Sequence, residues 1–464
     1  MLFNQTISKI SMNLRTVGML ALLLSASTAA LAQEPWGLER CIQYAISNNI
    51  TIKQQELRVS SSQNAVKKAQ WSQTPSLSAS SNNTVSFGRS RDNSNFASVD
   101  KTAWSGSLGI GSQLNLFNGF SIRSTIAKSK LDLQSDLLEV ERTRNDISLN
   151  IAAAYLQVLF NEELVSISER QLETTHLQVD RTQKLVDAGN LSQSNLLEIR
   201  SQQAQEEVSL VNAQNQLDIA YLTLKQLLEL PADTAFKVEH PSRLTVNEQY
   251  ALSTPGLLYQ TSQSLPQIKS AEIKVASAEK GVALAKSGYY PSLMLSAQYG
   301  TSYFNQAMEL KGLNPDGSMI YGKQAIRDQL DKNQSIGIGL SLNIPIFDRF
   351  STKYEVSNAR IGHTLAQLDL QQRKNTLYKE ISQAHADAVG ALKKYAATQK
   401  AREALAESFS SIDKKFNVGA ANSLDYNTAK NKLSQSESEL LQAKYQFIFK
   451  TKILDFYKGV PIKL

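Results

Sequence analysis

Apolar residues recur every seven positions along two long stretches of this chain, and this period constrains its fold most strongly. In the first stretch the repeating positions are Ile151, Val158, Val165, Leu172, Val179 and Val186. Adding 230 to each number gives a second set, in which five of the six residues are apolar or aromatic: Ile381, Ala388, Tyr395, Arg402, Phe409 and Phe416. A seven-residue period held for this long predicts helices that pack side by side with a left-handed supercoil.

The same offset of 230 residues aligns other features, which indicates a tandem duplication. The stretch "LNLFNGFS" at 114–121 lies over "IPIFDRFS" at 344–351. Three residues beyond each seven-residue position the side chains are mostly small, as at Asn161, Ser168 and Thr175. Small side chains there would let neighbouring helices approach one another closely.

The helical stretches define the expected elements. A helix over 120–186 would measure roughly 100 Å at 1.5 Å per residue, and no compact globular domain needs a rod of that length. The other expected helices cover 192–230, 350–416, 422–456, 37–72 and 253–288. Pro266 should break the last of these, because proline cannot continue the helical hydrogen-bond ladder.

Between the helices the period changes from helical to two. Residues 336–346 alternate isoleucine or leucine with glycine, serine, asparagine and proline, and residues 104–116 alternate in a similar way. Alternation over about ten residues is typical of outer-membrane strands, with the apolar side toward lipid. A soluble half-buried hairpin would fit any single strand equally well.

Each of these strands follows another strand, which begins near Pro75 or Pro291. The connections at about 89–102 and 305–333 are expected to be long polar loops. Four strands cannot close a barrel alone, since the smallest membrane barrels use eight. Further copies of the chain would have to supply the remaining strands.

The first 32 residues have the pattern of a secretory signal. Lys9 and Arg15 precede an apolar stretch at 17–24, and "ALA" at 30–32 offers a small-residue cleavage site. An uncleaved membrane anchor fits less well, because eight apolar residues fall short of the roughly 20 that span a bilayer as a helix. We therefore expect the mature chain to be exported.

Composition and motifs give no sign of a nucleic-acid partner or of catalysis. The 49 Lys and Arg and 42 Asp and Glu are interspersed along the helical stretches, as on a solvated surface. The four histidines lack metal-ligand spacing, and neither a phosphate-binding loop nor a catalytic triad is recognisable. We expect no cofactor and no enzymatic activity. Cys41, the single cysteine, is expected in the core of the first helix.

Together these features resemble the TolC-type outer-membrane efflux proteins over essentially the whole mature chain. The resemblance rests on the duplicated strand-end motif, and on "PSL" at 75–77 and again at 291–293. It also rests on "SNNITIKQQE" at 47–56, "SLPQIKSAE" at 264–272 and the G-x-x-x-S-x-D turn at 419–425. Each motif is weak alone, but their repeated order is specific.

The resemblance implies a mixed α and β membrane protein built from two tandem repeats. Three protomers would each give four strands to one twelve-stranded transmembrane β-barrel. The helices would continue it across the periplasm as a long α-helical coiled-coil barrel. The implied parts are a signal peptide at 1–32, a first repeat at 33–231, an equatorial linker at 232–252 and a second repeat at 253–464.

The resemblance also implies a function. Such proteins are outer-membrane exit ducts of Gram-negative tripartite efflux or type I secretion systems, and they conduct substrates passively. The implied partners are two further copies in a homotrimer, a periplasmic adaptor (membrane fusion) protein, an inner-membrane transporter of RND or ABC type, and outer-membrane lipid. The alternative is an exported coiled-coil scaffold or adhesin without transport activity. A general diffusion porin fits less well, because it would not devote so much of its chain to helices.

Two short turns join the long helices, and the resemblance places both at the periplasmic entrance. Gly189 and Gly419 can take the positive φ that closes a helix C-terminus, while Ser192 and either Ser423 or Asn422 can cap the next helix. The expected adaptor contacts are Gly189, Asn190, Leu191, Ser192, Gly419, Ala420, Ala421, Asn422 and Ser423. Alternatively, these residues are small only because the turns are tight.

Asp425 has two interpretations. An acid in the first turn of a helix is favoured by the helix dipole and needs no other role. By resemblance it would lie in the constricted entrance, where three copies would form a cation-attracting ring. A second acid one turn on is replaced by Thr428, and the equivalent positions of the first repeat are Asn195 and Glu198. A double ring is therefore not expected, and any ring is weaker or is shared between Asp425 and Glu198.

Overall fold

The computed structural model describes residues 35–91, 98–231, 233–241 and 254–463. The expected signal peptide and most of the expected linker lie outside the described residues. The chain divides into two compact units. The helical unit comprises the described residues of Met1–Gln55, Val140–Leu265 and Lys374–Leu464. The strand unit comprises the described residues of Glu56–Glu139 and Pro266–Arg373.

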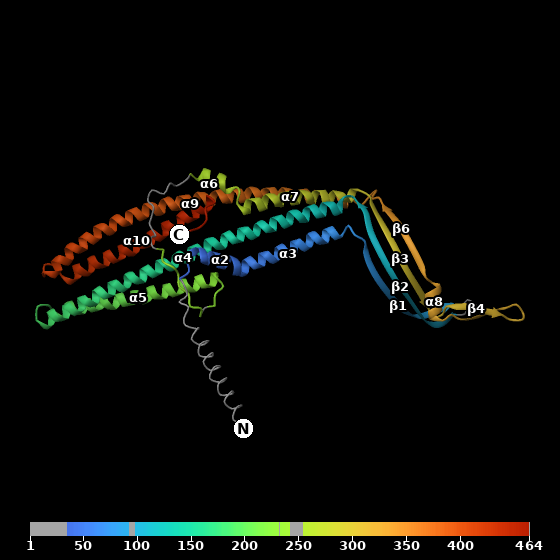
Figure 1. Ribbon diagram of the computed structural model, residues 1–464, viewed down its shortest axis with the longest axis horizontal. Helices are drawn as coiled ribbons and strands as arrows, with labels where there is room; N and C mark the ends of the chain where they lie inside the picture. The colour runs from blue at the N-terminus through green and yellow to red at the C-terminus, as the bar shows by residue number, and fades with distance from the viewer. Residues whose placement is uncertain (1–34, 92–97, 232, 242–253, 464) are drawn as a thin grey trace, which may run out of the picture. The chain divides into compact units, whose positions relative to one another are not determined.

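The strand unit contains an antiparallel sheet in the order β1-β2-β3-β6, whose strands lie side by side in Figure 1. The strands are β1 (Ser76–Arg91), β2 (Ser98–Asn118), β3 (Ser292–Phe304) and β6 (Ser335–Asn343). The four expected strands are confirmed. Within the described chain, β1 and β6 each pair on one side only, so both are edge strands.

The register places the apolar residues of the alternating pattern on one side of the sheet from Leu108 to Leu114 of β2 and from Ile336 to Leu342 of β6. Directly paired residues of neighbouring strands share a face. One face carries Ile110, Tyr299 and Ile336, which are paired across β2, β3 and β6. The other face carries the next paired set: Gly111, Gln298 and Gly337. We call these the apolar face and the Ser/Gly face.

The predicted boundaries of the two polar loops are wrong, because regular secondary structure extends into both segments. Strand pairing between β1 and β2 continues to Arg91 and Ser98, well into the predicted loop at 89–102. Residues 92–97 lie outside the described residues. Backbone hydrogen bonds hold a two-stranded ladder together whatever the polarity of its side chains, so polar composition alone did not end these strands.

The segment predicted as a loop at 305–333 is also structured. It contains a hairpin of β4 (Met308–Leu313) and β5 (Met319–Lys323), followed by α8 (Ile326–Lys332). Gln329 of α8 is buried, and its amide bonds to the backbone N–H and C=O of Phe304 at 2.7 and 3.0 Å. This anchor fixes α8 to the end of β3.

The long helices occur where the seven-residue period predicts them. In chain order they are α4 (Ser121–Asp187), α5 (Gln193–Leu227), α9 (Ser351–Asn417) and α10 (Ser423–Tyr457). Both α4 and α9 have 67 residues, and both α5 and α10 have 35. No helix in the described part of the chain has the length and apolarity needed to cross a membrane.

The shorter helices are each divided once. The break at Pro266 is confirmed, between α6 (Pro255–Ser262) and α7 (Pro266–Lys286). The single helix expected over 37–72 is wrong, because α2 (Leu38–Asn48) ends before Asn49 and α3 (Ile50–Trp71) begins after it. Asn49 has an extended backbone, and its side-chain oxygen accepts a hydrogen bond from the N–H of Thr51 at 2.9 Å. It therefore caps α3 and separates the two helices.

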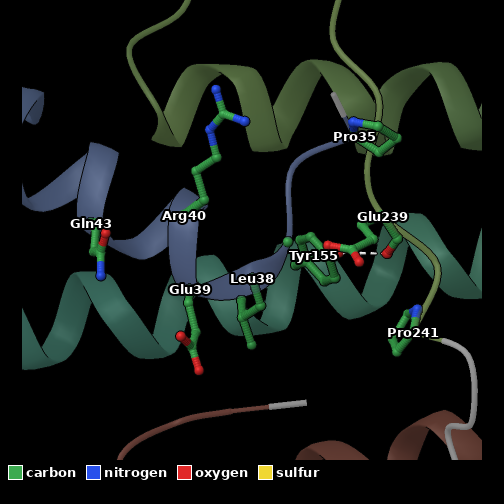
Figure 2. Close-up of a pocket in the computed structure, with 9 residues that line it drawn as sticks. Pro35, Leu38, Glu39, Arg40, Gln43, Tyr155, Glu239 and Pro241 are labelled. Atoms are coloured by element: carbon green, nitrogen blue, oxygen red, sulfur yellow. Dashed lines mark hydrogen bonds between the residues drawn. The ribbon is translucent and has the colours of Figure 1, made fainter. Parts of the chain in front are cut away.

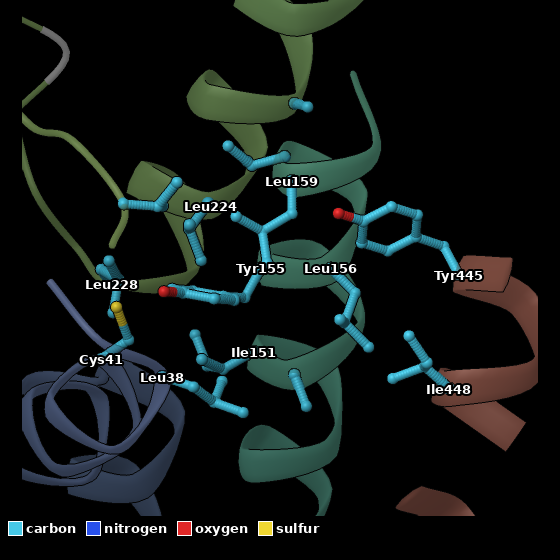
Figure 3. Close-up of a cluster of buried hydrophobic side chains, with 14 of the residues drawn as sticks. Leu38, Cys41, Ile151, Tyr155, Leu156, Leu159, Leu224, Leu228, Tyr445 and Ile448 are labelled. Carbon is cyan, nitrogen blue, oxygen red and sulfur yellow. The ribbon is translucent and has the colours of Figure 1, made fainter. Parts of the chain in front are cut away.

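The core of the helical unit joins α2, α4, α5 and α10 (Figure 3). Cys41 is fully buried there, as expected, and burial raises the pKa of its thiol to about 12. A thiol with so high a pKa stays protonated and unreactive at neutral pH. Ile151 and Val158 on α4 are also fully buried in this cluster.

After Val158, the residues of α4 that are buried belong to a different set of positions. The large residues of the seven-residue set from Val165 to Val186 are only half-buried. The smaller residues three positions on are buried instead: Asn161, Ser168, Thr175 and Thr182. The side of α4 that faces the chain's own helices therefore carries small residues along this stretch, and the close helix approach expected from them stays a prediction.

Candidate functional site

A short turn ends each of the two long helical hairpins (Figure 1), and the two turns share a positive-φ glycine and a pattern of backbone hydrogen bonds. Gly189 and Gly419 have φ of +74° and +76°, as predicted. In the second turn the N–H of Ala420 donates to the carbonyl of Lys415 at 2.8 Å, and that of Gly419 donates to Phe416 at 3.1 Å. The first turn repeats these bonds at Gly189 and Asn190, so both are Schellman motifs.

The caps that follow the two turns differ. The side-chain oxygen of Asn422 accepts a hydrogen bond from the N–H of Asp425 at 2.8 Å, which confirms the predicted cap of α10. The predicted cap by Ser192 is wrong, since its side chain makes no capping hydrogen bond. Its backbone carbonyl instead accepts from the N–H of Asn195 at 3.1 Å. Ser423 is buried at the start of α10.

The predicted entrance residues lie within two turns of these caps. Asp425 and Thr428 are exposed on α10, and Glu198 is exposed on α5 next to the half-buried Asn195. Neither the Asp425 nor the Glu198 carboxylate forms an ion pair within the described residues. Both acids are therefore free to attract cations or to meet a partner, while no described contact brings Asp425 and Glu198 together.

The tips also expose apolar side chains. Val418 is 79% exposed and Leu424 is 67% exposed, on either side of the second turn. Ala420 is exposed and Ala421 is half-buried between them. These side chains give the second tip a small exposed apolar surface.

Sequence reasoning missed a buried ion pair that fastens the two hairpins together. Lys430 of α10 lies 2.9 Å from the Glu206 carboxylate of α5, and both residues are 8% exposed. The hydroxyl of Thr175 on α4 hydrogen bonds to both charged groups. Buried charges are tolerated when they are paired and hydrogen-bonded in this way.

A signal for this pair was present in the sequence. Ile199, Ala213 and Ala220 of α5 are buried at seven-residue spacing, and Glu206 occupies the missing position of that line. A charged residue on an otherwise apolar line predicts a buried partner. The partner lies 224 residues away, so its identity could not be predicted from spacing alone.

Further contacts join the hairpins around this ion pair. The side-chain amides of Gln202 and Asn431 bond reciprocally, at 2.9 and 3.2 Å. Within the second hairpin, the ring of Tyr426 on α10 stacks on Phe416 of α9, with centroids 4.7 Å apart. Burial, with the nearby Asp413 and Glu206 charges, raises the pKa of Tyr426 to about 12. The phenol therefore stays neutral, and the tip is held by packing and hydrogen bonds.

A cavity of about 520 Å³ lies at the other end of the helical unit, between α2 and α4 (Figure 2). The Tyr155 hydroxyl lies 2.6 Å from the Glu239 carbonyl and 3.1 Å from that of Trp36. These contacts hold the short parallel bridge between Trp36 and Val238. The described residues contain no cluster of three acidic, histidine or cysteine side chains that could hold a metal.

The apolar face of the sheet is exposed. Ile336 and Ile338 of β6 are 79% and 78% exposed, and Leu77 and Trp104 are also exposed on the neighbouring strands. A continuous apolar surface on one side and glycine, serine and glutamine on the other require two different environments. Lipid on one side and water on the other meet that requirement.

Comparisons with known proteins agree with this architecture. A model of the outer membrane efflux protein family matches residues 41–229 and 257–450. The chain is 21% identical over 372 residues to the outer membrane protein TolC of Escherichia coli K12, covering 74% of this chain and 72% of TolC. It is 20% identical to the toxin and drug export protein A of Aggregatibacter actinomycetemcomitans, covering 89% and 83% of the two chains.

Solved structures show the same fold. The crystal structure of CusC aligns with 92% of this chain and 93% of the CusC chain, with a TM-score of 0.76 and 17% sequence identity. The structure of VceC from Vibrio cholerae aligns with 92% of this chain and 96% of the VceC chain, with a TM-score of 0.71 and 17% sequence identity. The chain therefore has the fold of these outer-membrane proteins.

The chain belongs to the outer membrane efflux protein family. The resemblance drawn from the duplicated motifs is confirmed. The protein is an outer-membrane efflux duct whose helices lie in the periplasm. The family is named for efflux and the relative from Aggregatibacter actinomycetemcomitans for export, and none of the proteins given above is named for an enzymatic activity.

Proposed function

We propose that the protein is one protomer of a homotrimeric exit duct, in which three four-stranded sheets close into one twelve-stranded transmembrane β-barrel. The observation that carries the proposal is the sheet itself, with its apolar face, its Ser/Gly face and its two edge strands. The function is passive conduction of substrates that an inner-membrane transporter delivers through a periplasmic adaptor.

The edge strands favour closure by further copies. β1 and β6 leave backbone N–H and C=O groups unpaired within the described chain, and in lipid such groups must be satisfied. Pairing β6 of one copy with β1 of the next removes every edge. Each copy adds four strands, and the family resemblance selects three copies rather than two.

The helices supply a second reason for assembly. The seven-residue positions of α4 from Val165 to Val186 are half-buried in the single chain, as are Phe409 and Phe416 of α9. A neighbouring hairpin would cover these side chains and complete a helical barrel. The equal lengths of α4 and α9, and of α5 and α10, support two tandem repeats at 33–231 and 253–464.

The tips are the proposed meeting point with the adaptor. Gly189 to Ser192 and Gly419 to Ser423 form two compact turns, and three copies present six of them. The transporter would be of RND or ABC type. Relatives named for toxin and drug export or for antibiotic efflux make such molecules the proposed cargo classes.

The test is expression with the native leader, followed by fractionation and bilayer recording. We expect a heat-modifiable trimer in the outer-membrane fraction and discrete channel openings after reconstitution. Cross-linking in cells should recover an adaptor and an inner-membrane transporter. A soluble periplasmic monomer without conductance would overturn the proposal and favour the coiled-coil scaffold.

A further inference from the structure

The junctions between sheet and long helices have a duplicated turn that the proposed function does not explain. Each turn follows the pattern Phe-x-x-Phe, at 117–120 and 347–350. Phe120 has φ of +66° and Phe350 has φ of +63°, in the left-handed region. The two phenylalanines of each turn meet edge to face, with centroids 5.2 and 5.5 Å apart.

Glycine precedes the second phenylalanine in one turn and arginine in the other. A Cβ on Gly119 would clash with the Ser287 carbonyl oxygen, so close packing explains the glycine. Arg349 has φ of +58°, where a non-glycine residue is strained. Its side chain is exposed and forms no ion pair within the described residues. The strained backbone at Arg349 is therefore not explained by an ion pair of its side chain with any described residue.

A cation also follows each turn three residues later. Arg123 and Lys353 occupy equivalent positions at the offset of 230 residues, and both are exposed. The Lys353 amine lies 5.4 Å from the centroid of the Phe350 ring. Neither side chain forms an ion pair with any residue that the structure describes. The second turn therefore presents an aromatic ring beside an exposed cation, and the first turn has an exposed cation at the equivalent position.

The four helix ends next to the sheet are strongly basic. The ten residues of α3, α4, α7 and α9 nearest the strands contain nine Lys and Arg but only two acids, Glu279 and Glu355. At the ends of α3 and α7 the basic residues are Lys67, Lys68, Lys280 and Lys286. At the starts of α4 and α9 they are Arg123, Lys128, Lys130, Lys353 and Arg360. We call these nine residues, with Arg349, the basic collar.

The tip ends of the long helices are different. Ten-residue windows at the ends of α4 and α9 and the starts of α5 and α10 hold seven basic and five acidic residues. The positive excess therefore belongs to the end beside the sheet and does not extend along the helices. Within the collar, only Lys128 has a described carboxylate partner, Asp132 at 2.8 Å.

The collar lies where the apolar face ends. Beyond β6 the apolar alternation continues through Ile344 and Ile346, which are 56% and 95% exposed, and then reaches Phe347 and Phe350. Aromatic rings at the end of an apolar band mark the interfacial layer of a membrane. Lysine and arginine just outside that layer attract anionic headgroups.

We infer that the basic collar and the two Phe-x-x-Phe turns form a binding site for anionic phospholipids of the periplasmic leaflet. This inference rests on the proposed function, because it requires the sheet to lie in the membrane. The apolar face and phenylalanine rings contact the acyl chains near the headgroup. Arg123, Arg349 and Lys353 bind the headgroup phosphate, and arginine can do so through two N–H groups at once.

The test compares lipid retention by the purified full-length trimer using native mass spectrometry. Detergent-solubilised protein is incubated with equal amounts of phosphatidylglycerol and phosphatidylethanolamine. We expect several-fold more phosphatidylglycerol than phosphatidylethanolamine to remain bound. The triple variant R123Q/R349Q/K353Q should lose most of this preference. The matched variant K414Q/K415Q/K432Q removes three exposed cations at the tips and should keep it.

Two further arms separate the alternatives. Inorganic phosphate should not displace phosphatidylglycerol; full displacement would mean that a free anion, and not a lipid, is the ligand. Arg349→Gly relieves the positive-φ strain, so it should lower lipid preference without lowering thermal stability. A loss of stability with unchanged lipid preference would assign Arg349 a structural role and overturn its part in the site.

Bilayer recording distinguishes failure of this inference from failure of the proposed function. A wild-type trimer that conducts but retains both lipids equally would overturn the lipid site alone. A chain that neither forms trimers nor conducts would overturn the proposed duct, whatever its lipid content. A collar variant that conducts normally and has lost the preference would support both.

Discussion

Asp425 and Glu198 illustrate how duplicated positions in one chain can acquire different chemistry. Both are exposed acids on the helix that follows a tip turn, but they lie one helical turn apart in the aligned repeats. Asp425 also gains from its place in the first turn of α10, where its own N–H is capped by Asn422. The helix-dipole role is therefore present in the structure, and the pore role remains a prediction.

Replacing Asp425 with alanine tests the pore role. If three copies form a ring, Asp425→Ala should weaken the block of single-channel current by multivalent cations on the order of tenfold, since about 1.4 kcal/mol of lost attraction corresponds to that factor. Asp413→Ala, which removes a half-buried acid near the end of α9, is the matched control. An unchanged block in the Asp425 variant would count against a pore acid.

The buried pair of Lys430 and Glu206 predicts an asymmetric response to mutation. Lys430→Met alone leaves the Glu206 carboxylate buried without its partner, which costs about 3–5 kcal/mol of unfolding free energy. The double variant K430M/E206M should recover most of that loss, because both charges are gone. Thermal unfolding of the trimer measures both. Equal destabilisation in the single and double variants would contradict the pairing as the cause.

At the scale of elements, glycine is required for different reasons in the tip turns and in the junctions between the sheet and the long helices. Gly419 has positive φ, and a Cβ added there would have open space around it, so only its backbone conformation requires glycine. Gly119 has positive φ and close backbone neighbours, so conformation and packing both require it. The same substitution should therefore have different effects at the two sites.

Three glycine-to-alanine variants should change the free energy of unfolding by different amounts. Gly419→Ala should cost about 1–2 kcal/mol from the left-handed backbone alone. Gly119→Ala should cost more, since Ser287 and Tyr290 would have to move. Gly390→Ala, in the interior of α9, should instead stabilise by up to about 1 kcal/mol. Thermal unfolding midpoints should follow this order, and a mild effect at Gly119 would contradict the packing argument.

At the scale of the whole molecule, the two faces of the sheet decide where the protein can reside. The exposed isoleucine, leucine and aromatic side chains of the apolar face favour lipid, and the Ser/Gly face favours water. Closure of the proposed barrel would satisfy both faces at once. The family assignment and the sheet therefore give the same location by independent routes.

A matched pair of lysine substitutions tests this assignment of faces. Ile338→Lys places a charge on the apolar face and should cost about 2–4 kcal/mol if the site is near the bilayer centre. Gln298→Lys, one pair away on the Ser/Gly face, should insert normally and change ion selectivity. The yield of heat-modifiable trimer in the outer membrane and the reversal potential measure the two effects. Equal insertion of both variants would contradict the assignment.

Much of this architecture could be read from sequence because it depends on residues close together in the chain. The seven-residue period located all four long helices, and the two tip glycines located their turns. Period-two alternation located the strands of the sheet. Local signals failed where a single side chain interrupted a helical pattern. Asn49 caps α3 and so divides the segment that was predicted as one continuous helix.

Sequence by itself therefore determined the helices, the turns, the strands and, through repeated motifs, the family. Only the tertiary structure decided the strand order, the edges left open for other copies and the burial of Lys430 against Glu206. It also revealed the β4–β5 hairpin and the helix α8 in place of a polar loop. The reason is physical: periodicity and turn chemistry act over a few residues, whereas pairing and burial depend on which distant segments pack together.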